Sequence, residues 1–165
     1  MVGRFLAGIG AVIWAPSERR YLLVRRTPDK DFAPGVWECV TGRVDQGESF
    51  EDALHREVRE EIGTAVTADF IIGTTHFYRG PAVPENELVG VVYHCSLNNP
   101  SAVRLNEEHD DLRWVTYDEA RALLAESVHR SEQWMLNLLG RAERMHTRDF
   151  AGVIVHNRQI GLELG

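Results

Sequence analysis

The chain has 165 residues, of which 44% are hydrophobic and 26% charged, and its formal net charge is -7. This balance is typical of a globular protein, so the length predicts a single domain over residues 1–165 with a core that needs no disulfide scaffold. The negative charge argues against binding to a nucleic-acid polymer or an anionic membrane, because both favour a basic surface.

The first part of the chain predicts a hairpin, a loop and a further strand. Residues 5–14 and 21–26 are rich in aliphatic side chains, and the break between them predicts two strands joined as a hairpin. Residues 27–35 contain two prolines and a glycine, which is typical of a loop. A strand is expected over residues 36–41, followed by a glycine-marked turn.

The clearest predicted helix covers residues 49–62. Ser49 can cap its N-terminus, with Asp52 in the capping-box position, and Gly63 stands where a left-handed residue commonly ends a helix. Apolar side chains recur every four residues and predict one buried face, made of Phe50, Leu54, Val58 and Ile62.

The second half of the chain predicts strands first and helices afterwards. Strands are expected over residues 66–78, 88–97 and 111–115, and helices over 117–125 and 131–145. Residues 150–164 are expected to form a late strand or a strand pair. Without repeats or linkers, the sequence indicates one domain of mixed content.

The cysteines and the N-terminus bear on the cellular location. Cys39 and Cys95 each lie in an apolar, strand-like stretch and are interpreted as buried small side chains. Residues 1–14 lack the small-residue cleavage site of a signal peptide, and the longest apolar run, residues 7–15, is too short to cross a bilayer. We therefore expect a cytoplasmic protein.

Three glutamates of the predicted helix, Glu57, Glu60 and Glu61, lie within an arc of about 100°. At about 6 Å and an effective dielectric constant of about 20, each pair repels by up to about 3 kcal/mol. Two of them occupy the last turn, where the helix dipole favours cations, and Arg56 and Arg59 offset only part of the repulsion. A divalent cation would offset most of it, because magnesium prefers oxygen ligands. A solvated acidic helix face is the alternative interpretation.

The neighbouring residues extend this pattern. Gly42 is followed after five residues by Glu48, and after seven more by the run REVREEIGT, which begins at Arg56. This spacing resembles the Nudix box, G-x5-E-x7-R-E-U-x-E-E-x-G-U, where U is a bulky aliphatic residue. Every fixed position matches, Val58 fits the first aliphatic position, and Thr64 departs from the last one. This departure is mild and leaves the predicted metal site intact.

The resemblance implies a fold, a cofactor and an activity. It implies the α+β Nudix fold, an α/β/α sandwich in which a mixed β-sheet packs between helices. It also implies magnesium, or manganese, as cofactor for hydrolysis of a diphosphate bond in a small nucleotide-like substrate. The implied site residues are the metal-binding Glu57, Glu60, Glu61 and the Gly42 carbonyl, the orienting Arg56, and Glu48 and Gly63, which support the box. Glu48 either supports the loop or contacts the metal through water.

In the implied mechanism, one to three ions bridge the phosphate oxygens and lower the pKa of a bound water, which attacks phosphorus in line. Glu60 and Glu108 are the two candidates for the general base, and an exposed loop acid is the alternative interpretation of Glu108. Arg25 and Arg26 are expected either to contact phosphate or a base, or to extend into solvent.

Several substrates and one other class of function remain open. The stretch 37–42, together with Glu108 and His109, is similar to the dihydroneopterin triphosphate pyrophosphatase branch, while dinucleoside polyphosphates and nucleotide sugars are alternatives. We expect the loops 27–35 and 79–87 to decide, and residues 76–78 either line the cleft or pack elsewhere. A Nudix-like module that binds nucleotide without cutting is the alternative of another class. Family members are often homodimers, although no apolar surface stripe here demands one.

Overall fold

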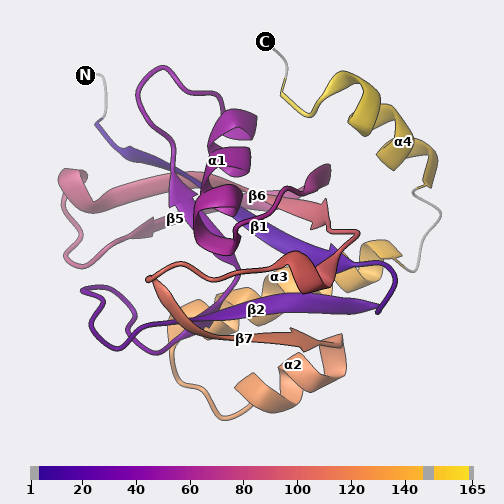
Figure 1. Cartoon of the computed structure of the whole chain (residues 1–165). Helices are drawn as coiled ribbons and strands as arrows, with labels where there is room; N and C mark the ends of the chain where they lie inside the picture. The colour runs from indigo at the N-terminus through magenta and orange to yellow at the C-terminus, as the bar shows by residue number, and fades with distance from the viewer. Residues whose placement is uncertain (1–3, 147–150, 164–165) are drawn as a thin grey trace.

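The computed structural model of the chain describes residues 4–146 and 151–163. Its strands are β1 (Leu6–Ala15), β2 (Arg20–Arg26), β3 (Trp37–Glu38), β4 (Val40–Arg43), β5 (Thr67–Tyr78), β6 (Glu87–Ser96) and β7 (His109–Val115). Its helices are α1 (Phe50–Ile62), α2 (Tyr117–Leu124), α3 (Arg130–His146) and α4 (Ala151–Ile160), with short 3-10 turns over Pro84–Asn86 and Pro100–Ala102. Figure 1 shows their arrangement.

Strand β1 organises the sheet. It pairs in parallel with β6 from Leu6 to Trp14, and antiparallel with β4 through its first half and with β2 at its end. The main path of the sheet runs β3-β2-β1-β6-β5, with β7 added to β2. One parallel pair among antiparallel ones makes this the mixed sheet that the resemblance implies.

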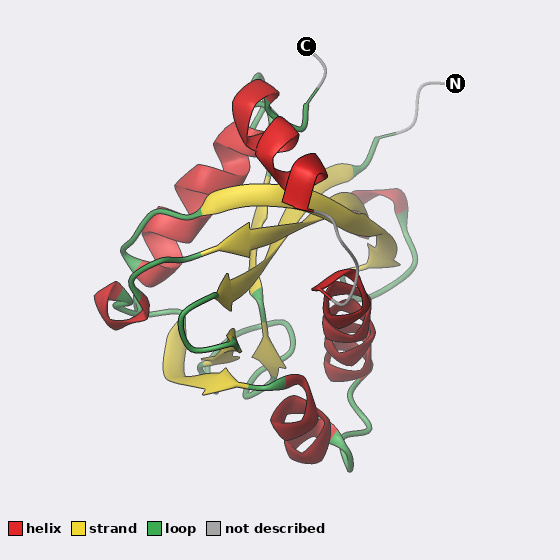
Figure 2. Ribbon diagram, turned by 90° about the vertical axis from the view of Figure 1, so that its right-hand side faces the viewer, coloured by secondary structure: helices red, strands yellow, loops and turns green. Residues whose placement is uncertain are grey.

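Helices cover both faces of the sheet, as Figure 2 shows. Helix α1 packs over β1 and β4, where Leu54, Val58 and Ile62 are fully buried in one apolar cluster. Helices α2 and α3 pack on the second cluster, which contains Leu124, Met135 and other residues of the opposite layer. The α+β sandwich is therefore confirmed.

The predicted limits of helix α1 are confirmed by its capping contacts. The Ser49 side chain accepts a hydrogen bond from the Asp52 backbone N–H, and Gly63 ends the helix at a φ of 68°, in the left-handed region. These contacts fix where the helix begins and ends, and therefore where its glutamates stand.

Two predicted elements differ from the structure. The strand expected over residues 36–41 is divided at Cys39, because the chain leaves its pairing with β2 there and continues against β1. The prediction of a strand over residues 150–164 is wrong, since residues 151–160 form helix α4. Residues 150 and 164 lie outside the described part. Cys39 and Cys95 are buried and free, as predicted.

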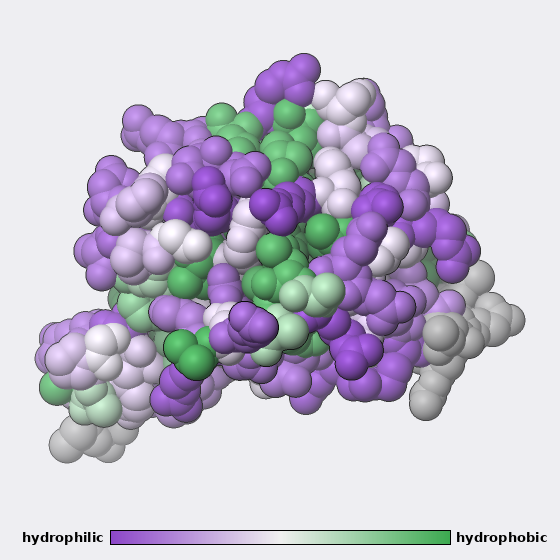
Figure 3. Space-filling model, turned by 90° about the horizontal axis from the view of Figure 1, so that it is seen from below, coloured by the Kyte–Doolittle hydropathy of each residue, from purple (hydrophilic) through white to green (hydrophobic). Residues whose placement is uncertain are grey.

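The surface is mostly polar on the face that Figure 3 shows, where hydrophobic residues lie in small groups among hydrophilic ones. Within residues 4–146 and 151–163, none of the helices has the length and apolar character needed to span a bilayer.

Candidate active site

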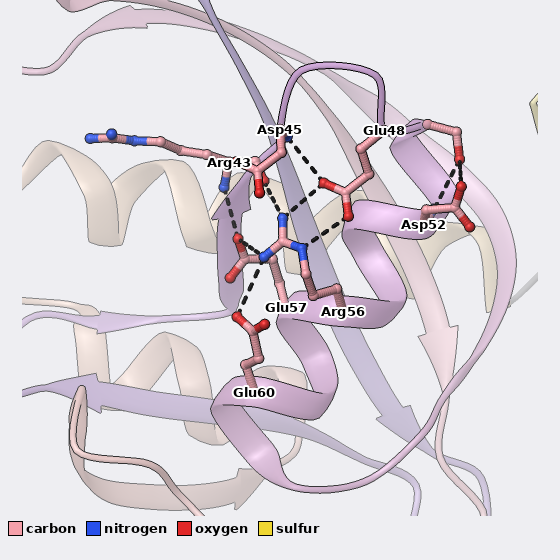
Figure 4. Close-up of polar contacts among 8 residues, drawn as sticks. Arg43, Asp45, Glu48, Asp52, Arg56, Glu57 and Glu60 are labelled. Atoms are coloured by element: carbon pink, nitrogen blue, oxygen red, sulfur yellow. Dashed lines mark hydrogen bonds and ion pairs between the residues drawn. The ribbon is translucent and has the colours of Figure 1, made fainter.

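Arg56 is the centre of a polar network at the start of the acidic helix (Figure 4). Its Nε and Nη2 donate to the two carboxylate oxygens of Glu48, each at 2.9 Å, and Nη2 also donates to the Arg43 carbonyl at 2.8 Å. Its Nη1 donates to Glu57 Oε1 at 2.8 Å and to Glu60 Oε2 at 3.4 Å. One guanidinium thus fixes the loop before the helix and two of the clustered carboxylates, and an orienting role of Arg56 would require such contacts.

Glu48 ties the loop to this network. Its Oε2 also accepts a hydrogen bond from the Asp45 backbone N–H at 3.0 Å. The hydrogen bonds from Arg56 and then from Asp45 lower the pKa of Glu48 to about 2. These contacts tie the Glu48 carboxylate both to the loop and to helix α1.

The absence of a side chain at Gly42 gives Glu57 its place. A Cβ at position 42 would lie 2.0 Å from Glu57 Cδ, so no other residue fits without moving this carboxylate. Glu57 Oε1 also accepts a hydrogen bond from the Arg43 backbone N–H at 3.1 Å. Burial raises the pKa of Glu57, although Arg56 opposes the shift.

Glu61 is the most unusual carboxylate of the helix. It is 5% exposed, and its Oε2 is buried without a hydrogen-bond partner. Burial, followed by the charges of Glu38, Glu57 and Glu108, raises its pKa well above the ordinary value. A buried oxygen of this kind costs free energy unless a donor or a cation satisfies it.

A cavity of about 1190 Å³ opens in front of these carboxylates. Of the residues that the sequence analysis selected, it is lined by Arg26, Gly42, Glu57, Glu61 and Glu108. Glu60, with 57% of its side chain exposed, is not among the lining residues. Arg25 is also outside the cavity, because it bonds Asp110 at 2.7 Å.

The outer walls of the cavity are aromatic and basic. The rings of Phe32 and Phe77 stack with centroids 6.3 Å apart, and the Arg79 guanidinium lies 5.2 Å from the Phe32 ring centre. All three line the cavity, and so do His76 and Tyr78. Residues 76–78 therefore take the cleft-lining position, and both expected recognition loops contribute to the wall.

The fit of these carboxylates to a divalent cation depends on how many of them converge. Within the described residues, no three His, Cys, Asp or Glu side chains are close enough together to hold an ion as they stand. The donor set nevertheless fits, because Glu61 presents an unsatisfied buried oxygen and Glu57 is held beside it, both at the cavity. Carboxylate oxygens are the ligands that magnesium prefers.

Two residues near Glu61, the buried His109 and the partly buried Glu38, which lines the cavity, were given no role by the sequence analysis. Glu38 Oε1 lies 3.2 Å from His109 Nε2, and His109 Nε2 lies 3.9 Å from Glu61 Oε2. A signal for Glu38 was present, since a single charge stands inside the apolar run of residues 36–40. His109 was selected only as part of the branch resemblance, and no local pattern predicts its contacts, because Glu38 lies on strand β3 and Glu61 on helix α1.

Comparisons with known proteins agree with this geometry. Residues 4–138 match the family model of the NUDIX domain. The NAD-capped RNA hydrolase NudC of Stutzerimonas stutzeri (strain A1501) is 35% identical over 125 residues, which are 74% of this chain but only 42% of that relative. The nucleoside triphosphatase NudI of Enterobacter sp. (strain 638) is 32% identical over 113 residues, which are 62% of this chain and 77% of that relative.

A solved structure shows the same fold. The MutT protein from Methanosarcina mazei Go1 superposes with a TM-score of 0.70 at 21% sequence identity, covering 90% of this chain and 99% of that one. At this identity, the likeness concerns the fold alone.

Proposed function

Because the chain belongs to the Nudix hydrolase family, we propose that it is a magnesium-dependent enzyme which cuts a diphosphate bond in a nucleoside diphosphate linked to a further group, such as a nucleoside triphosphate. The observation that carries this proposal is the buried, unsatisfied oxygen of Glu61 at a cavity with basic and aromatic walls. Acidic ligands next to basic side chains suit a cation bound together with phosphate.

The cation would be held by Glu57, Glu61 and the Gly42 carbonyl, with Glu60 beside them on the exposed side of the helix. When bound, magnesium or manganese neutralises phosphate charge and lowers the pKa of a water ligand. Arg43 and Arg79, which line the same cavity, would bind phosphate oxygens by charge. The Phe32 and Phe77 rings offer a flat apolar surface to a nucleobase or a pterin.

Glu108 is the general base that we propose, since its carboxylate lines the cavity and that of Glu60 does not. Glu108 Oε2 lies 3.1 Å from Lys30 Nζ, which keeps the carboxylate ordered at the edge of the cavity. We expect Glu108→Gln to lower kcat by about 100-fold and Glu60→Gln by much less. A larger loss in Glu60→Gln would transfer the role to Glu60, and near-normal rates in both variants would refute the assignment.

The size of the cavity supports a substrate with groups on both sides of the diphosphate. Pockets for small ligands usually measure about 300–1000 Å³, and this one is larger. A screen with magnesium and with manganese should compare nucleoside triphosphates, dinucleoside polyphosphates, nucleotide sugars and dihydroneopterin triphosphate. Resolving pyrophosphate, phosphate and monophosphate among the products identifies the bond that is cut.

The cytoplasmic location and the homodimer stay predictions.

The alternative of another class is a module that binds nucleotide without cutting it. Such modules typically lose glutamates from the box, whereas this chain keeps Glu57, Glu60 and Glu61. Nucleotide binding without turnover of any substrate in the screen, with either metal, would favour the module and refute the enzyme.

A further inference from the structure

A buried polar chain leads from strand β2 to the carboxylate of Glu61. Arg26 Nη1 donates to Glu38 Oε1 at 3.0 Å, and the same oxygen lies 3.2 Å from His109 Nε2. Only 11% of the Arg26 side chain, 12% of the Glu38 side chain and 1% of the His109 side chain are exposed. Arg26 is fixed in turn, because its Nε donates to the Phe32 carbonyl at 2.9 Å.

The backbone keeps this chain in register. Strand β2 pairs with β3 on one side, where Val24 opposes Glu38, and with β7 on the other, where Arg26 opposes His109. The three side chains therefore come from three hydrogen-bonded strands, which leaves His109 little freedom to move. His109 is a fixed group against which the end of helix α1 is placed.

The groups around His109 determine which of its ring nitrogens carries a hydrogen. Its Nε2 faces two carboxylate oxygens, Glu38 Oε1 at 3.2 Å and Glu61 Oε2 at 3.9 Å. Both are acceptors, so the Nε2 atom must carry the hydrogen. Glu61 Oε2 and His109 Nδ1 are each buried without a partner. The Nε2–H group thus donates to Glu38 Oε1, and it lies 3.9 Å from Glu61 Oε2, in contact with that oxygen but beyond hydrogen-bond distance.

We propose that His109, anchored by Glu38 and Arg26, is a positioning residue: its ring packs against the Glu61 carboxylate and keeps it turned toward the cavity for a divalent cation. His109 is not among the residues that line the cavity, whereas Glu38 and Glu61 are. It therefore acts through Glu61 and not on the substrate. The inference rests on the proposed function, since it concerns the same cation site. Removing a group that orients a metal ligand typically weakens metal binding by about 10–100-fold.

Two amide substitutions separate the donor from the ring. In His109→Gln the side-chain nitrogen reaches the position of Nε2 and keeps a donor there, while in His109→Asn the shorter amide cannot reach it. A matched control is His94→Gln, because His94 is 2% exposed and its Nδ1 lies 3.0 Å from Asp69 Oδ2 in a network away from the cavity. Glutamine at position 94 loses that Nδ1 contact, so the control removes one buried histidine contact elsewhere.

Manganese binding is measured by calorimetry without substrate, well below the unfolding temperature of each protein. We expect His109→Asn to weaken binding by about 10-fold or more, His109→Gln to stay within about threefold of the wild type, and His94→Gln to match the wild type. Equal affinities of His109→Asn and the wild type would overturn the inference, and so would an equal loss in His94→Gln. If the wild type takes up no manganese, either alone or together with nucleotide, the proposed function itself fails, a result distinct from both.

Discussion

Two buried carboxylates, Asp69 on β5 and Glu61 at the end of α1, are almost equally hidden from water but differ in their partners. Asp69 accepts hydrogen bonds from His94, Ser96 and Arg158, whereas Glu61 Oε2 accepts none. Burial alone would raise the pKa of Asp69, but these bonds lower it, while the pKa of Glu61 is raised by burial. Burial therefore does not distinguish a structural acid from a functional one, and the partners do.

The largest expected effect is on activity. Glu61→Gln removes the charge that we assign to the cation, a contribution of several kcal/mol, so kcat with magnesium should fall by about 100-fold or more. Asp69→Asn should stay within about twofold of the wild type, because Asp69 does not line the cavity. Steady-state assays on the substrate identified by the screen measure both. Equal losses in the two variants would abolish the distinction.

The second effect is on stability, with the order reversed. Asp69→Asn breaks a buried pair with Arg158 and should lower the free energy of unfolding by about 2–3 kcal/mol, a value reduced because 42% of the Arg158 side chain is exposed. Glu61→Gln removes an unsatisfied charge and should not lower the free energy of unfolding in metal-free buffer. Urea unfolding followed by circular dichroism measures both. A large loss of stability in Glu61→Gln would show that Glu61 has a structural role.

The sequence predicted what local spacing determines. Arg56, Glu57 and Glu61 lie on one helix whose period and caps are visible in the chain, so their convergence was predictable. Glu38 and His109 join the site only through the pairing of β2 with β3 and β7, which periodicity does not reveal.

The prediction for the C-terminal segment was wrong for a related reason. Residues 150–164 were expected to form a strand or a strand pair, yet Val153 and Val155 lie on helix α4 and are 50% and 54% exposed. Helix α4 is held by Ile154, which packs against the second cluster, and by polar contacts, with Asn157 donating to the Asp69 carbonyl at 2.9 Å and Arg158 pairing with the Asp69 carboxylate. A pattern of apolar residues cannot report such contacts, and tertiary contacts override local propensity.

A smaller loss of activity is expected from a change at Arg56, which is the partner of other carboxylates of the box. Arg56→Lys keeps the charge but loses the planar fork that contacts Glu48 and Glu57 together, so we expect kcat to fall by about 10-fold. Arg59→Lys, an exposed change on the same helix, is the matched control and should have no effect. The same kinetic assay measures both variants, and an unchanged rate in Arg56→Lys would contradict the orienting role.

The smallest effect is a pH dependence with opposite signs at the two acids. The pKa of Glu61 is raised in the folded protein, so the protonated group favours the folded state. The contribution of Glu61 to stability therefore falls as the pH rises from the pKa of the unfolded chain, about 4.3, through the pKa of the folded protein. The lowered pKa of Asp69 gives stability above its unfolded value, about 3.9, that is lost as pH falls through the folded one.

Metal-free urea unfolding measures these slopes, between about pH 2 and pH 4 for Asp69 and from about pH 4 to pH 8 for Glu61. The stability of Glu61→Gln relative to the wild type should increase with pH, and the deficit of Asp69→Asn should shrink as pH falls. The same sign of slope in both variants would contradict the assigned partners.

The central claim is that Glu61 is left without a hydrogen-bond partner in order to bind a cation. The most direct test is the free energy of unfolding of the wild type and of Glu61→Gln, measured in urea without metal and with about 10 mM magnesium. A ligand that binds only the folded state stabilises that state. We predict that Glu61→Gln is at least as stable as the wild type without metal, and that magnesium stabilises the wild type far more than the variant. Equal stabilisation of the two proteins, or none of the wild type, would contradict the account.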